Sequence, residues 1–474
     1  MKNRFISTTA EYSWYAMIAI LPITSMPLVS SLLGSDSVAS PSILFLIAVV
    51  IFWLIPSFSK NKSFHPSILP LFIFVMAALV GSVISFFYDI PAFKGISQYP
   101  PIFSAFSTLT IGFLFFVCAS SYPIEMKIRK ETMRIINWSG LIIFLWCSVQ
   151  AASWYTINKY PQWMFELQGL ISARVLYRQR VTGFALEPSW LAHQLNMLYL
   201  PFWLSFTLHK KSNHSFRLLF LTFENILLAL GVITLLLTLS RVGVAAFLLM
   251  IILAGIVIHG RVVDFLNKKF SNKSKISRKL ISIGLIIFYV IGIGLTVIVF
   301  SKVDPRMAAL FEFSFENENP FITYFNELKF GDRVIYWWTG WNIFGNYPIF
   351  GVGLGNAGFF FPTAIPPEGW QMVEVSKLMN RTSILLNIKS LWVRLLAETG
   401  MVGFSLFFGW LLFLAYYFLK KIRSKKFDLR IMGYAGFFVL LGIILEGLSI
   451  DSFAMPYWWV SLGLAVSDAG IEKK

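Results

Sequence analysis

Apolar runs of about 20 residues recur along almost the whole chain, separated by short polar segments. A helix needs about 20 mostly apolar residues to cross the roughly 30 Å hydrocarbon core of a bilayer. The pattern therefore predicts an all-α polytopic membrane protein with about twelve spanning helices. The predicted spans are residues 14–33, 41–57, 67–88, 101–120, 135–154, 188–208, 218–238, 241–259, 280–301, 391–419, 431–449 and 453–468.

The composition agrees with a membrane protein. Hydrophobic residues make up 57% of the 474 residues and charged residues 13%, whereas soluble domains contain about 25% charged residues. A water-soluble globule and a disordered chain are thereby excluded. The two cysteines, Cys118 and Cys147, lie in apolar runs, so neither a disulfide framework nor a thiolate metal site is indicated.

The basic residues predict the orientation of the helices. With Lys2 and Arg4 in the cytoplasm, the clusters of Lys and Arg at 127–134, 261–279 and 420–430 all fall in loops on the cytoplasmic side. This is the positive-inside rule, and it predicts that both termini are cytoplasmic. The excess of 40 basic over 23 acidic residues is explained by membrane lipid, so nucleic acid is not indicated as a partner.

Three regions follow from these spans. Residues 1–301 contain the first nine spans, with an outer loop at 155–187, and residues 391–474 contain the last three spans and a cytoplasmic tail. Between them, residues 302–390 form a large extracytoplasmic loop. Loops of this length are rarely structureless, and this one is rich in aromatic residues, which favour the membrane interface. It is predicted to contain helices that lie on the membrane surface.

Several arginines stand where the positive-inside rule does not place them. Charges near the apolar slab are costly and usually mark a substrate path or an ion pair. Arginines that meet at one outer pocket would bind a phosphate or diphosphate through paired hydrogen bonds. The alternative is that each one reaches lipid headgroups or pairs with a carboxylate. The candidate residues are Arg174, Arg178, Arg180, Arg333 and, after Ser240 in a tight turn, Arg241.

Two carboxylates form a second set of candidates. Glu187 precedes Pro188 at the start of the sixth predicted span, where negative charge also favours a helix N-terminus. Glu398 lies within the tenth predicted span, four residues after Arg394. That spacing places both side chains on one helical face, so an ion pair within the helix is the alternative to a catalytic role.

Other chemistry is not indicated. The G-x-G-x-x-G string at 353–358 lies in no strand–turn–helix unit, so it does not predict a nucleotide site. The five histidines form no metal-ligand pattern, and His193 is interpreted as a polar group of the core or of a vestibule. Neither a metal nor a cofactor is expected.

Four blocks resemble the O-antigen polymerase and ligase superfamily. The blocks are Arg180-Val181-Thr182-Gly183 with Glu187-Pro188-Ser189, Ser240-Arg241-Val242-Gly243, the run from Arg333 through Trp337 and Pro348 to Gly355, and Leu395 to Gly403. They follow the order of the family. The resemblance implies a glycosyltransferase architecture of the GT-C-like kind.

The resemblance also implies an activity. A glycan carried on undecaprenyl diphosphate at the outer face of the bacterial inner membrane is transferred to an acceptor sugar, without a metal and with inversion at the anomeric carbon. The arginines would stabilise the departing diphosphate. On this reading the catalytic candidates are Arg241, Glu187, Lys389 and Glu398, and the substrate-binding candidates are Arg180, Arg333, Arg178, Arg174 and Ser240.

One position departs from the ligase pattern. Ligases of the superfamily carry a histidine nine residues before the glutamate of the last block, and Lys389 stands there in this chain. The departure favours a polymerase, whose donor and acceptor are both lipid-linked repeat units and which a chain-length regulator protein would accompany. The alternatives are an O-antigen ligase or protein O-oligosaccharyltransferase and, from another class, a polysaccharide flippase or transporter.

Overall fold

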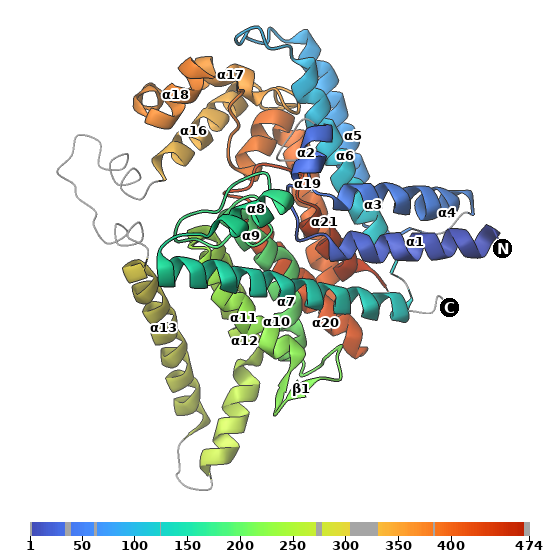
Figure 1. The fold of residues 1–474 in the computed structure, drawn as a ribbon, viewed down its shortest axis with the longest axis vertical. Helices are drawn as coiled ribbons and strands as arrows, with labels where there is room; N and C mark the ends of the chain where they lie inside the picture. Colours follow the sequence, from blue (N-terminus) through green and yellow to red (C-terminus); the bar gives the residue numbers. More distant parts are fainter. Residues whose placement is uncertain are drawn as a thin grey trace.

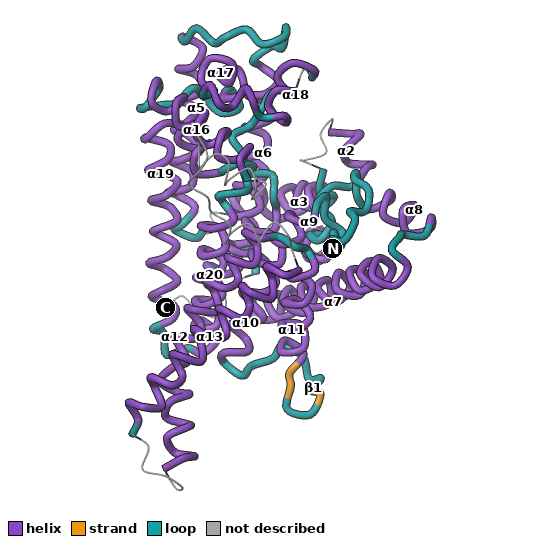
Figure 2. Tube along the Cα trace, turned by 90° about the vertical axis from the view of Figure 1, so that its left-hand side faces the viewer, coloured by secondary structure: helices purple, strands orange, loops and turns teal. Residues whose placement is uncertain are grey.

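The computed structural model describes residues 2–33, 39–60, 64–123, 125–271, 277–303, 330–382 and 384–468. Residues 304–329, in the first part of the predicted outer loop, lie outside the described residues. The described chain is almost entirely helical, with one short antiparallel hairpin of β1 (Arg217–Leu218) and β2 (Leu221–Thr222). Figures 1 and 2 show the arrangement from two sides.

The helices are bounded as follows: α1 Lys2–Ala19, α2 Pro27–Leu33, α3 Ser42–Val49, η1 Val50–Leu54, α4 Ile55–Ser59, α5 Ile68–Ile84, η2 Ser85–Phe87, α6 Tyr99–Ser121, α7 Met126–Ile157, α8 Gln162–Ile171, α9 Pro188–Gln194, η3 Leu195–Tyr199, α10 Leu200–Leu208, α11 Phe223–Leu237, α12 Arg241–Ser271, α13 Arg278–Val303, α16 Gly331–Asn346, α17 Ala357–Ala364, η5 Pro367–Gln371, α18 Val373–Arg381, α19 Leu391–Ile422, α20 Phe427–Glu446 and α21 Pro456–Val466.

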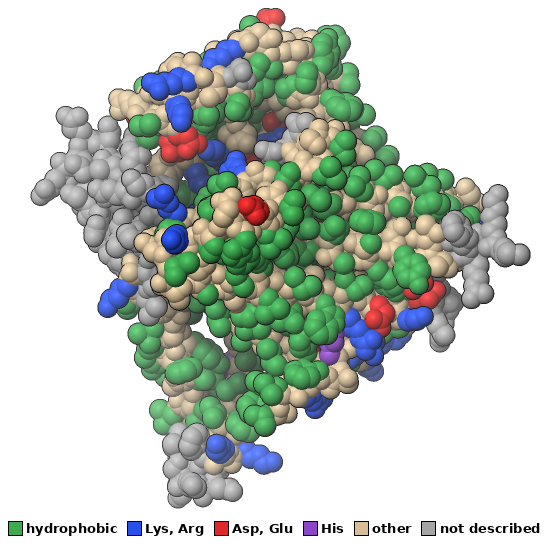
Figure 3. All heavy atoms as spheres, viewed as in Figure 1, with side chains coloured by type: hydrophobic (Ala, Val, Ile, Leu, Met, Phe, Trp, Pro, Cys, Tyr) green, Lys and Arg blue, Asp and Glu red, His purple; other side chains and the backbone are tan. Residues whose placement is uncertain are grey.

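The all-α polytopic membrane fold predicted from the sequence is confirmed. Among the described residues, eight helices are long and apolar enough to cross a bilayer, and they coincide with eight of the predicted spans. Their outward faces carry many exposed Leu, Ile and Phe side chains, which cover much of the surface in Figure 3. Such a continuous apolar surface is stable in lipid and not in water.

The other four predicted spans take different forms. The range 14–33 is interrupted after α1, and the helix resumes in α2 at Pro27; Pro22 lies in the interruption, where it would otherwise break a helix. The range 188–208 is helical throughout, as α9, η3 and α10, but it carries buried polar side chains. Helix α11 has 15 residues and α21 has 11.

Helix α21 is short because protein surrounds it. All of its residues are buried, and it packs against α6 and α20. Trp459 donates a hydrogen bond from Nε1 to the carbonyl oxygen of Phe453 at 2.9 Å, which fastens the preceding loop to the helix. A helix enclosed in this way need not match the thickness of the bilayer.

Two helices widen into a π turn before a proline. η1 ends two residues before Pro56, and η3 ends two residues before Pro201. Proline donates no backbone hydrogen bond, and its ring collides with the carbonyl four residues earlier. The wider turn relieves that collision, and such turns often occur at functional sites. The η3 turn contains Asn196, which belongs to the polar network described below.

The segment 348–353, which leads into the glycine string at 353–358, forms a backbone junction with α19. Helix α19 is interrupted at Gly400, whose φ is +61°. The amide of Val352 donates to the carbonyl of Ala397 at 2.9 Å, and Met401 donates to Pro348 at 2.8 Å. Residues 348–353 therefore supply partners to the backbone groups freed by the interruption. We refer to residues 348–353 and 397–402 as the glycine junction.

The described part of the segment predicted to be the large outer loop forms a lobe with its own apolar core. Helices α16, α17 and α18 enclose a cluster that includes Ile335, Phe359 and Phe361, and Ala397 of α19 joins this cluster. The helices predicted for the large loop are therefore present in its described part. Figure 1 shows this outer lobe, residues 331–382, at the upper left of the molecule.

The glycine junction makes a prediction about stability. A Cβ atom at residue 400 would lie 2.3 Å from the carbonyl oxygen of Ile349, in a left-handed backbone conformation. Gly400→Ala should therefore destabilise the protein by at least about 2 kcal/mol, measured as a lower midpoint of thermal unfolding in detergent. Gly409→Ala is the matched control on the same helix, since nothing lies within 4 Å of its added carbon; equal midpoints for the two variants would contradict the junction.

Candidate functional site

Arg333 lies in the first turn of α16, where the outer lobe meets the membrane helices. Its Nη1 atom donates a hydrogen bond to the carbonyl oxygen of Ser449 at 3.2 Å. Ser449 belongs to the loop of residues 447–455, which joins α20 to α21 and which we call the α20–α21 loop. Figure 3 shows basic and acidic side chains in a hollow between the outer lobe and the rest of the molecule.

The surroundings of Arg333 are acidic. Burial lowers the pKa of its guanidinium below the ordinary value, and nearby carboxylates oppose this shift by stabilising the cation. Arg333 is partly buried among these carboxylates. It can receive an anionic substrate only through donors that are not already used, and a guanidinium has five N–H groups. The carboxylates are those of Asp451, Glu187, Glu374 and Glu446.

A buried polar network lies directly below the α20–α21 loop. The Nε2 atom of His193 lies 2.9 Å from a carboxylate oxygen of Glu446 and 3.1 Å from the hydroxyl of Ser449. The other carboxylate oxygen of Glu446 accepts a hydrogen bond from Asn196 at 2.8 Å. His193, Asn196 and Glu446 come from α9, η3 and the end of α20, and Ser449 comes from the α20–α21 loop, so the network ties those elements to the loop that holds Arg333.

Arg180 reaches the turn between α11 and α12, at the end of which Arg241 begins α12. Arg180 donates from Nε to the carbonyl oxygen of Thr238 at 2.8 Å. The hydroxyl of Ser240 accepts from the amide of Gly243 at 3.4 Å, and Arg241 begins α12 beside it. Residues 180 and 240–241, far apart in the sequence, are therefore neighbours in the fold.

This turn is joined to the polar network through Asn196. The Nδ2 atom of Asn196 donates to the carbonyl oxygen of Gly243 at 2.8 Å as well as to Glu446. The first turn of α12 therefore packs directly on the helix that carries His193. One helix, α9 with η3, connects the Arg180–Arg241 turn to the Arg333 side of the site.

Glu187 lies at the partly exposed edge of the same region. It precedes α9 and forms an ion pair with Arg174, while the hydroxyl of Ser189 donates to its second oxygen at 3.4 Å. Its side chain is 30% exposed, so solutes can reach it. Arg178 is exposed on the loop before α9. The structure thus brings Glu187 near Arg333, whereas Arg178 points to the surface.

Glu398 is committed to structural contacts. It forms an ion pair with Arg394 at 2.9 Å, and its side chain is only 4% exposed. Its backbone carbonyl accepts a hydrogen bond from Gly353 within the glycine junction. Arg394 also donates to the carbonyl oxygen of Asp451. The pair within one helix that the spacing allowed is present, and it helps to hold the α20–α21 loop.

Lys389 lies on the outer-lobe side of the site. Its ammonium group pairs with Glu374 and lies 4.4 Å from the centre of the Tyr336 ring. Tyr336 donates its hydroxyl hydrogen to the same carboxylate at 3.2 Å. Burial, followed by the charge of Glu374, raises the pKa of nearby Asp332 above its usual value, and Lys389 opposes that shift.

Several residues of this site were not identified from the sequence. His193 was interpreted as a polar group of the core or vestibule, and its contact with Glu446 was not foreseen. The density of polar residues in the helical range 188–208 was the available signal, because a lipid-facing helix rarely carries His, Gln and Asn together. In the part of the chain that the structure describes, no three His, Cys, Asp or Glu side chains gather to hold a metal ion.

Two comparisons with known proteins bear on these residues. A family model described as O-antigen ligase matches residues 226–408. The match contains the Ser240–Arg241 turn, Arg333, the glycine junction and Glu398, and it ends before the α20–α21 loop. Arg180, Glu187 and His193 precede it. No curated protein sequence matches the chain.

The polar network makes a prediction about stability. Glu446→Gln removes the charge that faces His193. It also replaces one carboxylate oxygen, which accepts hydrogen bonds, by an amide NH2 group, which donates them, beside Asn196. We expect a loss of about 1–3 kcal/mol in the free energy of unfolding, because the remaining buried groups lose partners. Denaturation monitored by tryptophan fluorescence measures this loss. Glu166→Gln on exposed α8 is the control, and an unchanged stability of the Glu446 variant would show that the network contributes nothing.

Proposed function

We propose that the chain polymerises lipid-linked oligosaccharides, because the match of residues 226–408 to an O-antigen ligase model supports the O-antigen polymerase and ligase superfamily. Members of the family are membrane enzymes of the glycosyltransferase kind. The proposed donor and acceptor are repeat units on undecaprenyl diphosphate at the outer face of a bacterial inner membrane. The distribution of basic residues supports a cytoplasmic location for both termini.

The observation that carries this proposal is that three separate segments bearing arginines are linked through α9 and η3. Arg180 donates to Thr238 in the turn before α12, Arg241 begins α12, and Arg333 reaches the α20–α21 loop from the outer lobe. Asn196 and Glu446 connect the two sides through buried hydrogen bonds. Guanidinium groups held in this way suit a diphosphate, because they offer paired donors in a fixed geometry.

The proposed reaction is a single displacement. The acceptor hydroxyl attacks the anomeric carbon of the donor sugar, the bond from that carbon to the diphosphate oxygen breaks, and the configuration inverts. Arg180, Arg241 and Arg333 stabilise the negative charge that develops on the leaving diphosphate. Removing one such preorganised donor typically costs a factor of about 10² to 10³ in rate.

Glu187 is the best-placed group to accept the proton of the attacking hydroxyl. It is partly exposed and lies within the electrostatic reach of Arg333. Glu398 is buried and paired with Arg394, so an acceptor sugar cannot reach it. The ammonium of Lys389 is held by Glu374 and lacks a free lone pair while it is paired. It suits contacts with the acceptor glycan or phosphate.

Lys389 is also the reason for favouring a polymerase over a ligase. The ligase pattern has a histidine at this position, and here a Lys389–Glu374 pair packs against Tyr336. An aromatic ring flanked by charged groups suits a sugar acceptor of a growing chain. Ligation to another acceptor remains the second candidate function, because the matched family is described as O-antigen ligase.

The first test of this proposal is a transfer assay with Arg241→Met. Proteoliposomes would receive an undecaprenyl-diphosphate oligosaccharide, and products longer than one repeat would be resolved by size. We expect the wild type to form a ladder and the variant to lose about 10²- to 10³-fold in rate, with an unchanged unfolding midpoint. Arg278→Met, at the exposed start of α13, is the charge-matched control.

The products of this assay separate the alternatives. Transfer only to an added lipid A core would assign the chain as a ligase, and movement of the donor lipid across the bilayer without transfer would assign it as a transporter. A normal ladder from the Arg241 variant would remove that arginine from the reaction.

The second test concerns the base. Glu187→Gln retains a hydrogen-bonding partner for Arg174 but removes the proton acceptor, so we expect a loss of at least about 10²-fold in the rate of transfer. Lys389→Met should mainly raise the acceptor concentration needed for half-maximal rate. If the lysine variant loses the catalytic rate and the glutamine variant keeps it, the two roles are exchanged.

A further inference from the structure

A second charged region lies away from the outer lobe, around Arg129 of α7. The Arg129 side chain is 4% exposed. Neither of its two terminal nitrogens, Nη1 and Nη2, has a hydrogen-bond partner among the described residues. A buried guanidinium without partners is strongly unfavourable, so such a group usually has a ligand or serves one.

Another buried cation nearby shows what a structural role requires. The ammonium of Lys421 donates to the carbonyl oxygens of Ala465, Val466 and Ser467 at 2.8–2.9 Å. It also lies 3.4 Å from Asp468. These contacts stabilise the charge of Lys421 and give hydrogen-bond partners to the carbonyl groups at the C-terminal end of α21. Arg129 receives no comparable set of contacts from the described residues, although both cations are buried at the same end of the molecule.

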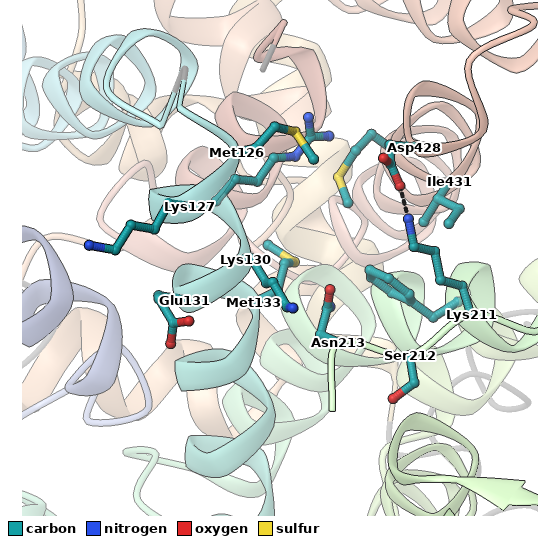
Figure 4. Close-up of a pocket in the computed structure, with 13 residues that line it drawn as sticks. Met126, Lys127, Lys130, Glu131, Met133, Lys211, Ser212, Asn213, Asp428 and Ile431 are labelled. Atoms are coloured by element: carbon teal, nitrogen blue, oxygen red, sulfur yellow. Dashed lines mark hydrogen bonds and ion pairs between the residues drawn. The ribbon is translucent and has the colours of Figure 1, made fainter. Parts of the chain in front are cut away.

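Arg129 is one of the residues that line a cavity, and its terminal nitrogens lie buried behind the cavity wall. The cavity has a volume of about 510 Å³ and lies between the start of α7, the segment that follows α10 and the start of α20. Figure 4 shows Lys130 and Asn213 beside it, with Lys211 and Asp428 across from α7. These segments lie towards the end of the molecule that carries the β1–β2 hairpin (Figure 2) and were predicted to be cytoplasmic.

The acidic groups of the cavity already have basic partners. Asp428 pairs with Lys211, and Glu131 pairs with Arg134 at 2.6 Å. The remaining groups are donors. They include Lys127, Lys130, the Arg129 guanidinium and the Nδ2 atom of Asn213, which is also buried without a hydrogen-bond partner.

The wall of the cavity is held in place before any ligand enters. The amide of Asn213 donates to Glu224 at 2.8 Å, and its carbonyl accepts from Nε of Arg134 at 3.0 Å. The backbone of Asn213 is thereby held beside α7. A preformed site loses little conformational entropy when a ligand binds.

We propose that this cavity binds the phosphate group of an anionic ligand, with the Arg129 guanidinium as its main contact. Arg129 and Asn213 each contribute buried donors without hydrogen-bond partners, and a ligand with several acceptor oxygens would satisfy them. Methionine side chains line the rest of the cavity and can contact an apolar portion. The source of the phosphate is either an anionic phospholipid headgroup or a free phosphate ester, and both present the same chemistry.

The experiment compares two probes on the purified full chain. Nanodiscs of phosphatidylcholine serve as the reference, and phosphatidylglycerol replaces part of that lipid in the first arm. In the second arm, inorganic phosphate replaces chloride at equal ionic strength. Thermal unfolding is measured in both arms, and native mass spectrometry counts retained phosphatidylglycerol. A ligand that binds only the folded state raises the unfolding midpoint.

We expect at least one probe to raise the midpoint of the wild type. Arg129→Met should weaken binding by about tenfold or more, because two charge-assisted hydrogen bonds are lost. Lys425→Met, which removes the same charge from an exposed position predicted to lie on the same side of the membrane, should bind like the wild type. A response to phosphatidylglycerol alone identifies a lipid site, and a response to inorganic phosphate identifies a site for free phosphate.

The proposal is overturned if neither probe stabilises the wild type, or if Arg129→Met and Lys425→Met respond alike. Arg129→Lys and Asn213→Ala keep the test valid should the methionine variant fail to fold. The lysine variant retains the charge but not the paired donors, so it should bind with intermediate affinity, whereas wild-type affinity in both of these variants also overturns the proposal. Failure here leaves the transfer reaction at the outer lobe unaffected.

Discussion

The backbone hydrogen bonds of the glycine junction are the constraint on which the outer site depends. They attach the outer lobe to α19 at the interruption near Gly400, where amides of α19 donate to carbonyl groups of residues 348–349. Arg394 of the same helix reaches the α20–α21 loop, and that loop contacts both His193 and Arg333. A shift at the junction would therefore move the outer lobe together with the α20–α21 loop that binds Arg333. Rigid attachment of this kind is what a preorganised electrostatic site needs.

Buried charged side chains have different sets of partners at the two ends of the molecule. At the outer end, Glu446 and Glu398 each have a defined partner, and Arg333 shares its donors with a backbone carbonyl. Near the opposite end, Lys421 is satisfied by the end of α21, whereas the terminal nitrogens of Arg129 are not satisfied by the described chain. In a low-dielectric interior, satisfied charges stabilise a single arrangement, and unsatisfied charges favour the binding of an ion.

The sequence predicted the class of fold and part of the site, for reasons that are local. Helical spans follow from runs of apolar residues, and the Arg394–Glu398 pair follows from a spacing of four. The enclosed helix α21 was not distinguished from a lipid-facing span, because apolar residues suit both surroundings. Contacts between distant segments, such as His193 with Glu446, leave no periodic signal. Arg129 resembled any other cytoplasmic basic residue, since only the fold shows that it is buried without partners.

The hairpin of α12 and α13 has a mechanical consequence. The membrane-spanning window of α13 has no residue buried inside the protein, and the helix packs against α12. Its depth and tilt are therefore set mainly by the surrounding lipid, at a cost of fractions of a kcal/mol for each ångström of mismatch. A thicker or thinner bilayer can be accommodated by tilting of α13, while α12 keeps its packing against α9 and α20. Adjustment to membrane thickness is thus confined to a peripheral helix, and the first turn of α12 stays in place beside the polar network.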